Sequence, residues 1–261
     1  MHWWFKPPQS DRFRCLPRPD PIGRNGVRRR RFGVAAAEAL GPIGWVVFKP
    51  EFVEHVAHRR AALRAAAAAL VPAAGSIVFE IGCGHGHFLE NYARQFPERL
   101  CVGVDLRGER IERARKKARR AGLTNCHFIR AEAGEFLQSL PPDVTLREVW
   151  VLFPDPWPKK RHHKHRILQP EFFEFLAGRV GEGGRLYYRT DHREYFAEVA
   201  AFVPALQTWR LDPVAPWPLE HETVFQARAP SFQSLVAVRT SHPAKPAETT
   251  ALPPPAPADP K

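Results

Sequence analysis

The sequence contains only four cysteines in 261 residues, and they show no regular spacing. Cys15, Cys83, Cys101 and Cys126 form no Cys-x-x-Cys pair, which argues against a disulfide framework and against a cysteine-based zinc site. Long apolar runs are also missing, since no stretch approaches the roughly 18 residues that a membrane-spanning helix needs. The first residues lack the apolar stretch of a signal peptide. The sequence therefore predicts a reduced, cytoplasmic protein with no membrane partner.

Acidic residues are too few to balance the basic ones, because 39 Lys or Arg face 27 Asp or Glu, a formal net charge of +12. The excess is concentrated in three stretches. Residues 1–31 hold nine Lys or Arg against two acids, residues 107–120 hold eight against two, and residues 151–166 hold five against one. Such stretches either form a solvated surface or bind a polyanion, and their concentration favours the polyanion.

Composition separates two tails from the body of the chain. Residues 1–49 are rich in Pro and Arg, and residues 241–261 hold seven prolines and no aromatic residue. We expect both tails to be largely disordered, because they bury too little apolar surface to offset the entropy of ordering. Residues 50–240 remain as one predicted domain, since no internal linker divides them.

Short apolar segments alternate with helical ones through this body. The sequence predicts seven strands, at residues 76–82, 99–106, 126–133, 147–153, 184–191, 208–212 and 234–240. Helices are expected at residues 51–70, 87–96, 107–121, near 170–180 and at 192–203. This order predicts an α/β fold with a doubly wound, mostly parallel seven-stranded sheet, and the last two strands predict an antiparallel edge.

Three glycines at alternate positions, Gly82, Gly84 and Gly86, follow the first expected strand in "EIGCGHGHF". Glycine permits positive φ and lets a ligand lie against the backbone. The dinucleotide fingerprint would require a small residue where His87 stands, which disfavours NAD and FAD. A GxGxG loop preceded by Glu80 instead resembles the first motif of class I methyltransferases that use S-adenosylmethionine (SAM).

Acidic side chains stand at or near the ends of the first three expected strands. Ligands bind outside the carboxyl ends of the strands in such sheets. There, Asp105 can accept hydrogen bonds from ribose hydroxyls, and Glu132 can accept one from an adenine amino group. Each acid could instead cap the helix that follows it. With Glu80, they make three acids beside a glycine loop, which favours ligand binding.

The fourth expected strand runs into "FPDPWPKKRHHKHR", residues 153–166. Here Asp155 stands between two prolines and two positions before Trp157, and after Pro158 come eight consecutive Lys, Arg or His residues. This stretch resembles the signature of the tRNA (guanine-N7)-methyltransferase family. The resemblance extends over about residues 50–240, and it includes "YYRTD" with Asp191 and "PLEHETVF" near the end of the body.

The resemblance implies a Rossmann-like class I methyltransferase fold, SAM as the cofactor, and methyl transfer to N7 of a guanine in the variable loop of tRNA. It also implies that Asp155 is the catalytic residue. The implied cofactor-binding residues are Glu80, Gly82, Gly84, Gly86, Asp105, Glu132 and Asp155. The implied substrate and RNA contacts are Lys159, Lys160, Arg161, His162, His163, Lys164, His165, Arg166, Asp191 and Glu222. The family's Thr-x-x-Glu motif falls on residues 219–222, where Leu219 lacks the expected hydroxyl.

The chemistry of guanine N7 agrees with a rigid acidic corner. N7 has an in-plane lone pair and no proton, so methylation requires alignment and no general base. The ring becomes cationic during transfer, and the Asp155 carboxylate would stabilise that charge. Trp157 could stack on a base or form a wall of the site.

Three other interpretations remain open at this stage. The protein could be an RNA methyltransferase for an exocyclic amine or another base position, or a non-catalytic RNA-binding module. Histidines at 85, 87, 162, 163 and 165 could suggest a metal site, but methyl transfer requires no metal and we expect none. Both a monomer and a homodimer are compatible with the sequence.

Overall fold

The computed structural model describes residues 50–71, 75–221 and 224–244. The extension 1–49, residues 245–261 of the proline-rich tail, Cys15 and Glu222 lie outside the described residues, so the predictions for them stay predictions. Residues 241–244 belong to the expected tail, yet His242 O accepts a hydrogen bond from Arg239 Nη1 at 2.7 Å. The contacts of the body therefore extend beyond the expected boundary at residue 240.

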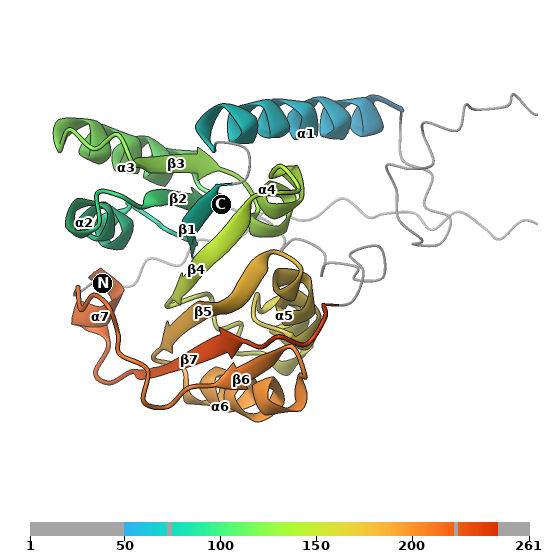
Figure 1. The fold of residues 1–261 in the computed structure, drawn as a ribbon, viewed down its shortest axis with the longest axis vertical. Coiled ribbons are helices and arrows are strands. Elements are labelled where there is room, and N and C mark those ends of the chain that lie inside the picture. Colours follow the sequence, from blue (N-terminus) through green and yellow to red (C-terminus); the bar gives the residue numbers. More distant parts are fainter. Residues whose placement is uncertain (1–49, 72–74, 222–223, 245–261) are drawn as a thin grey trace, which may run out of the picture. The chain divides into compact units, whose positions relative to one another are not determined.

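Seven strands form one sheet in the order β3-β2-β1-β4-β5-β7-β6 (Figure 1). Neighbouring strands from β3 to β5 pair in parallel, whereas β7 is antiparallel to both β5 and β6. The strands are β1 (Ser76–Ile81), β2 (Leu100–Asp105), β3 (Cys126–Arg130), β4 (Thr145–Leu152), β5 (Val180–Thr190), β6 (Trp209–Leu211) and β7 (Gln233–Arg239). The predicted mostly parallel seven-stranded sheet with an antiparallel edge is confirmed.

The helices alternate with the strands, as a doubly wound fold requires. They are α1 (Pro50–Leu70), α2 (His87–Gln95), α3 (Gly108–Arg120), α4 (Ala133–Ser139), α5 (Pro170–Ala177), α6 (Arg193–Phe202) and α7 (Val224–Arg228), with the 3₁₀ helices η2 (Lys160–His165) and η3 (Val203–Ala205). Four of these, α4, α7, η2 and η3, were not expected from the sequence. The expected strand 126–133 ends at Arg130, and α4 begins at the position where the strand was expected to end.

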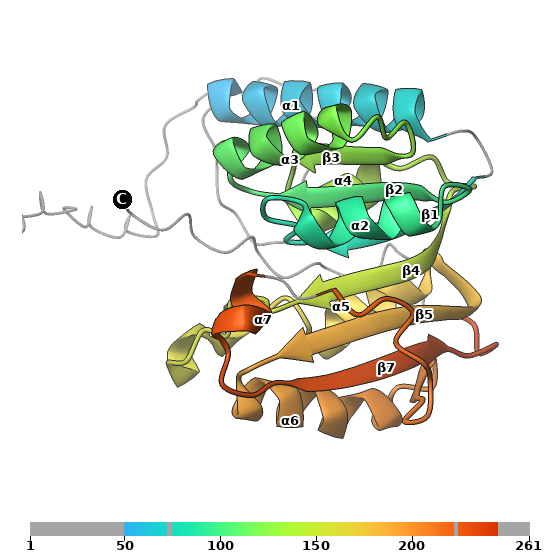
Figure 2. The same cartoon turned by 90° about the vertical axis from the view of Figure 1, so that its left-hand side faces the viewer.

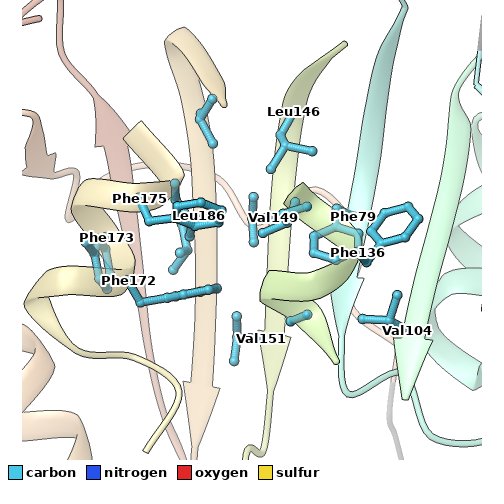
Figure 3. Packing of buried hydrophobic residues seen from close by; sticks show 14 of the residues in the cluster. Phe79, Val104, Phe136, Leu146, Val149, Val151, Phe172, Phe173, Phe175 and Leu186 are labelled. Atoms are coloured by element: carbon cyan, nitrogen blue, oxygen red, sulfur yellow. The ribbon is translucent and has the colours of Figure 1, made fainter. Parts of the chain in front are cut away.

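The central strands of the sheet are buried on both faces, which agrees with their continuous apolar runs. On one face, α4 and α5 pack side chains such as Phe136 and Phe172 against Phe79, Val149 and Leu186 (Figure 3). The rings of Phe79 and Phe136 stack with their centroids 5.3 Å apart. Helices α1 and α6 contribute to the same cluster.

The opposite face is covered differently in its two halves. Helices α2 and α3 cover it near β1 and β2 (Figure 2), through residues such as Leu89 and Ile111. Near β4 and β5 the cover includes Trp217, whose ring packs edge-to-face on Trp150 and Tyr187 at 5.2 and 5.3 Å between centroids. Segment 213–232, of which 222–223 are not described, thus contributes to the cover of this half. We call it the closing segment.

The described cysteines, Cys83, Cys101 and Cys126, are buried and free, in agreement with the predicted reduced state. Burial raises the pKa of the Cys101 thiol to about 12, so this thiol is uncharged at neutral pH. Among the described helices, none is long and apolar enough to cross a membrane.

Candidate active site

The glycine loop follows β1 directly and has the backbone conformation that its composition requires. Gly82, Gly84 and Gly86 all have left-handed φ, at 72°, 54° and 69°. A Cβ on Gly86 would lie 2.5 Å from a ring carbon of Phe128, so packing excludes a side chain there. A Cβ on Gly82 or Gly84 would meet nothing within 4 Å, which leaves open space over that part of the backbone.

Asp105 joins the end of β2 to this loop. Its Oδ2 accepts a hydrogen bond from the Gly84 amide at 3.1 Å, and its Oδ1 accepts one from the Arg107 amide at 2.7 Å. The guanidinium of Arg110 lies 3.6 Å from Oδ2. A carboxylate offers about four acceptor positions, so two remain for a ligand's hydroxyl groups.

Glu80 lies in β1 immediately before the loop and is only 4% exposed. Its Oε2 is buried without a hydrogen-bond partner among the described residues. Burial raises the pKa of this carboxyl to about 8, with a further contribution from the charge of Asp105, while a hydrogen bond from the Leu89 backbone opposes the rise. An unpaired buried carboxylate is costly, and a ligand that donates a hydrogen bond or carries a positive charge would satisfy it.

Glu132 caps the helix that follows it, which is one of the two roles that the sequence allows for the acids. It is the N-cap of α4, and its Oε2 accepts a hydrogen bond from the Glu135 amide at 2.8 Å. Its other oxygen keeps acceptor capacity, so capping and ligand binding are compatible. The adenine contact stays a prediction.

The corner at residues 153–157 follows β4, the strand that pairs with β1. Phe153 and Trp157 have left-handed φ of 49° and 46°, and they are the two non-glycine residues with positive φ in the described part of the chain. That conformation costs an L-residue roughly 1–2 kcal/mol. Asp155 lies between them with an exposed side chain. Stored strain beside an exposed carboxylate is typical of functional sites.

Two arginines on other elements hold this corner in its strained form. Arg166 Nε donates a hydrogen bond to Pro156 O at 2.8 Å, and Arg189 O accepts one from the Phe153 amide at 2.8 Å. The Trp157 ring packs against the ring of His165 at 5.2 Å. The structure thus fixes the backbone on both sides of Asp155.

Residues 159–166, which we call the cationic strip, include η2 and present most of their cations to solvent. Lys159, Lys160, Arg161 and Lys164 are exposed, and the three histidines are half-buried. Arg166 differs from the expectation, because its side chain is 1% exposed, pairs with Glu198 of α6 and lies over the Tyr195 ring at 4.8 Å. It is an internal anchor of the corner, and we exclude it from the RNA-facing set.

The remaining predicted substrate residues lie in loops. Asp191 follows β5 directly and is exposed at the carboxyl edge of the sheet. Leu219 lies in the closing segment and, like Trp217, packs partly buried against the apolar cluster on this face of the sheet.

Two further residues belong to this edge and were not singled out from the sequence. Lys117 Nζ donates a hydrogen bond to His85 O at 3.0 Å and lies 2.8 Å from His87 Nδ1, so it ties α3 to the glycine loop. Arg189 stands beside Asp191 in "YYRTD" and binds the closing segment. Neither could be recognised in advance, because Lys117 is one of eight cations in its stretch and arginine is rarely buried.

One group in the described residues could supply three metal ligands. Atoms of His163, Glu194 and Glu198 lie within 4.8 Å of one another. Glu198 already forms an ion pair with the Arg166 guanidinium. A positive charge at that carboxylate disfavours a second cation.

The family of the chain follows from comparison with known proteins. Residues 74–224, more than half of the chain, match the family model described as "Putative methyltransferase". The chain belongs to this methyltransferase family. The match covers the glycine loop, the corner and the cationic strip.

Curated proteins that are similar in sequence to this methyltransferase are named tRNA (guanine-N(7)-)-methyltransferase. The protein of Deinococcus radiodurans is 38% identical over 149 residues, which are 57% of this chain and 46% of that protein. The protein of Geobacter metallireducens is 32% identical over 155 residues, which are 59% of this chain and 73% of that protein. The chain spans about half the length of the Deinococcus relative.

Among solved structures, a SAM-dependent methyltransferase from Aquifex aeolicus is 16% identical, with a TM-score of 0.46 over 72% of this chain and 89% of that one. An rRNA methylase from Streptococcus thermophilus is 15% identical, with a TM-score of 0.43 over 76% of this chain and 100% of that one. Likeness at this level carries no information on substrate or mechanism.

Proposed function

We propose that this methyltransferase transfers a methyl group from SAM to N7 of a guanine in the variable loop of tRNA. The observation that carries the proposal is the juxtaposition of two loops that leave the paired strands β1 and β4. The first is the left-handed glycine loop, and the second is the strained corner around Asp155. The names of the relatives support guanine N7 of tRNA as the target.

The cofactor side is formed by β1, β2 and β3. Gly82 and Gly84 leave room for SAM against the backbone, Asp105 would accept from its ribose hydroxyls, and Glu132 would contact its adenine. Glu80 would receive a positively charged group of SAM, because its buried Oε2 has no other partner in the described structure. SAM supplies a methyl group that its sulfonium makes electrophilic.

The acceptor side is formed by the ends of β4 and β5. Asp155 would accept hydrogen bonds from the N1–H and the amino group of the guanine, which orients N7 toward the methyl group. The same carboxylate stabilises the positive charge that the ring acquires. No proton has to leave N7, so the site needs no general base.

The exposed cations of the strip would bind tRNA phosphates around the target nucleotide. Lys159, Lys160, Arg161 and Lys164 supply four positive charges directly after the corner. With tRNA as the substrate, we expect the protein to act in the cytoplasm.

The experiment that tests this function uses unmodified tRNA transcripts and SAM with a labelled methyl group. The matched control transcript carries 7-deazaguanosine at the variable-loop guanine, because a C–H group replaces N7 and nothing else changes. We expect label in the normal transcript and none at the substituted nucleotide. Equal incorporation into both transcripts would favour an exocyclic amine or another position. Binding without any incorporation would favour a non-catalytic RNA-binding module.

A further inference from the structure

Arg189 is a buried arginine at the carboxyl end of β5, and it is 4% exposed. Burying a guanidinium costs several kcal/mol unless its donors are paired. The hydrogen-bond partners of this guanidinium lie in the closing segment and at the start of strand β7. Arg189 Nη1 and Nη2 donate to the two carboxylate oxygens of Glu220 at 2.8 and 2.9 Å. Nη1 also donates to Gln226 at 3.1 Å, and Nε donates to Ser234 at 2.8 Å.

Two aromatic rings complete the surroundings of the guanidinium. Its carbon lies 4.2 Å from the ring centroid of Trp217 and 4.6 Å from that of Phe232. Trp217 is the residue that covers Trp150 and Tyr187, whereas Phe232 is 40% exposed. Arg189 therefore holds the closing segment at both ends, with one ring turned inward and the other in contact with solvent.

The same residue contacts the corner that carries Asp155. Arg189 O accepts the hydrogen bond of the Phe153 amide, at the first left-handed residue of the corner. The Phe153 ring packs edge-to-face on Phe232 with 6.2 Å between centroids. One residue thus joins two segments that are separated by about sixty positions in the sequence.

The sheet order places Arg189, Phe232 and the corner on one side of the site, opposite the glycine loop. Glu80, Asp105 and the glycine loop belong to β1 and β2, whereas the corner, Arg189 and Phe232 belong to β4, β5 and the start of β7. Because β7 is antiparallel to β5, its first residue, Gln233, pairs with Thr190 at the carboxyl edge. Phe232 consequently stands next to the strand end that leads to Asp191.

We propose that Arg189 is a positioning residue for the methyl acceptor, which holds the closing segment and the Phe232 ring against the corner that carries Asp155. An exposed aromatic ring at this place offers a surface on which the acceptor base can stack. The inference rests on the proposed function for the identity of that base. It predicts that loss of Arg189 impairs use of tRNA and leaves SAM binding intact.

The test compares Arg189→Gln and Arg189→Lys with the parent protein. Glutamine removes the charge, and lysine keeps a charge but cannot form the paired bonds to Glu220 or lie flat between two rings. The matched control is Arg239→Gln. Arg239 is a buried arginine at the other end of β7, where it donates to the carbonyl oxygens of Ala177 and Thr208.

Three quantities are measured on each protein: kcat/KM for tRNA, the dissociation constant for SAM, and amide hydrogen exchange in residues 153–157 and 213–232. For Arg189→Gln we expect kcat/KM to fall by roughly tenfold or more and the SAM constant to change by less than about twofold. Exchange should accelerate in both segments and stay unchanged in β1 and β2. Arg189→Lys should give kcat/KM and exchange rates between those of the parent protein and those of Arg189→Gln. Arg239→Gln should leave kcat/KM and the exchange of both segments unchanged.

The outcomes separate this inference from the proposed function. Faster exchange confined to residues 213–232, or equal losses of SAM and tRNA binding, would overturn the positioning role. An unchanged kcat/KM in Arg189→Gln would also overturn it. If the parent protein transferred no methyl group to guanine N7, the proposed function would fail, while the exchange data would still decide whether Arg189 couples the two segments.

Discussion

The carboxylate of Asp105 accepts a hydrogen bond from the amide of Gly84 at 3.1 Å, so the end of β2 holds the glycine loop that follows β1. Asp105→Asn replaces one acceptor oxygen with a donor and removes the charge. We expect SAM affinity to fall by roughly tenfold or more, since a hydrogen bond to a charged group contributes about 1.5–3 kcal/mol. Isothermal titration measures the affinity. Asp143→Asn, at an exposed acid between α4 and β4, is the control and should leave it unchanged.

Two glycines of the loop should respond differently to a single methyl group. Gly86→Ala places a Cβ 2.5 Å from Phe128, in addition to the cost of left-handed φ, and should destabilise the fold by roughly 2–4 kcal/mol. Gly84→Ala meets no protein atom within 4 Å and should cost only about 1–2 kcal/mol. Its methyl group would project into the space assigned to SAM. Urea unfolding and SAM titration of both variants check this contrast, and normal SAM binding by Gly84→Ala would contradict the assignment.

The raised pKa of the buried Glu80 carboxyl should give the protein an unusual pH dependence of stability. Its pKa is raised from 4.5 to about 8 in the folded state, so between these values the folded protein keeps a proton that the unfolded chain has lost. The free energy of unfolding should therefore fall as pH rises through this window, by at most about 1.4 kcal/mol per pH unit from this group. Glu80→Gln should remove that slope and bind SAM weakly. Urea unfolding at several pH values measures it, and an identical slope in both proteins would contradict the burial of an unpaired carboxyl.

The glycine loop and the succession of strands along the chain could be predicted from the sequence, because both depend on local patterns. Apolar runs that end in glycine mark buried strands, and most predicted strand ends agree with the structure within two residues. The start of β5 is an exception: the strand begins at Val180 and not at 184, since "GEGG" has the composition of a turn. Val180 pairs with Leu146 of β4, and residues 181–184 lie in the irregularity of register between this pair and the next one, Glu148 with Arg185.

The corner shows where the local pattern is insufficient. Its two prolines predict stiffness, but they do not predict the left-handed φ of Phe153 and Trp157, and the hydrogen bonds that hold the corner come from Arg166 and Arg189 on other elements. Similarly, residues 159–166 have a uniform composition, and the contacts that bury Arg166 come from other parts of the chain: Glu198, 32 positions away, the Pro156 carbonyl and the Tyr195 ring. Long-range partners of this kind leave no signal in a single sequence.

Substitution of the exposed cations of the strip and of the buried Arg166 should therefore have different effects on tRNA binding and on stability. Replacing Lys159, Lys160 and Arg161 with Ala should flatten the log–log salt dependence of tRNA binding by roughly two to three units, without a change in stability. Arg166→Gln should have little direct effect on the salt dependence, but it should destabilise the fold by roughly 1–3 kcal/mol, because the Pro156 carbonyl loses its donor and the partly exposed Glu198 loses its ion pair with the guanidinium. Filter binding and thermal unfolding give the two readouts, and a flattened slope with normal stability in Arg166→Gln would place that arginine on the RNA surface.

The position of the methyl group on tRNA tests the central proposal most directly. Methylation at N7 makes the guanine a fixed cation whose imidazole ring is open to reduction, so borohydride followed by aniline should cleave the chain at that nucleotide. We predict one cut, at a guanine of the variable loop, in tRNA treated with the parent protein and SAM. With Asp155→Asn we expect at least roughly a hundredfold less cleavage, since the amide keeps the shape but loses the charge that opposes the cationic ring. Methyl incorporation into tRNA with no induced cut would contradict transfer to N7.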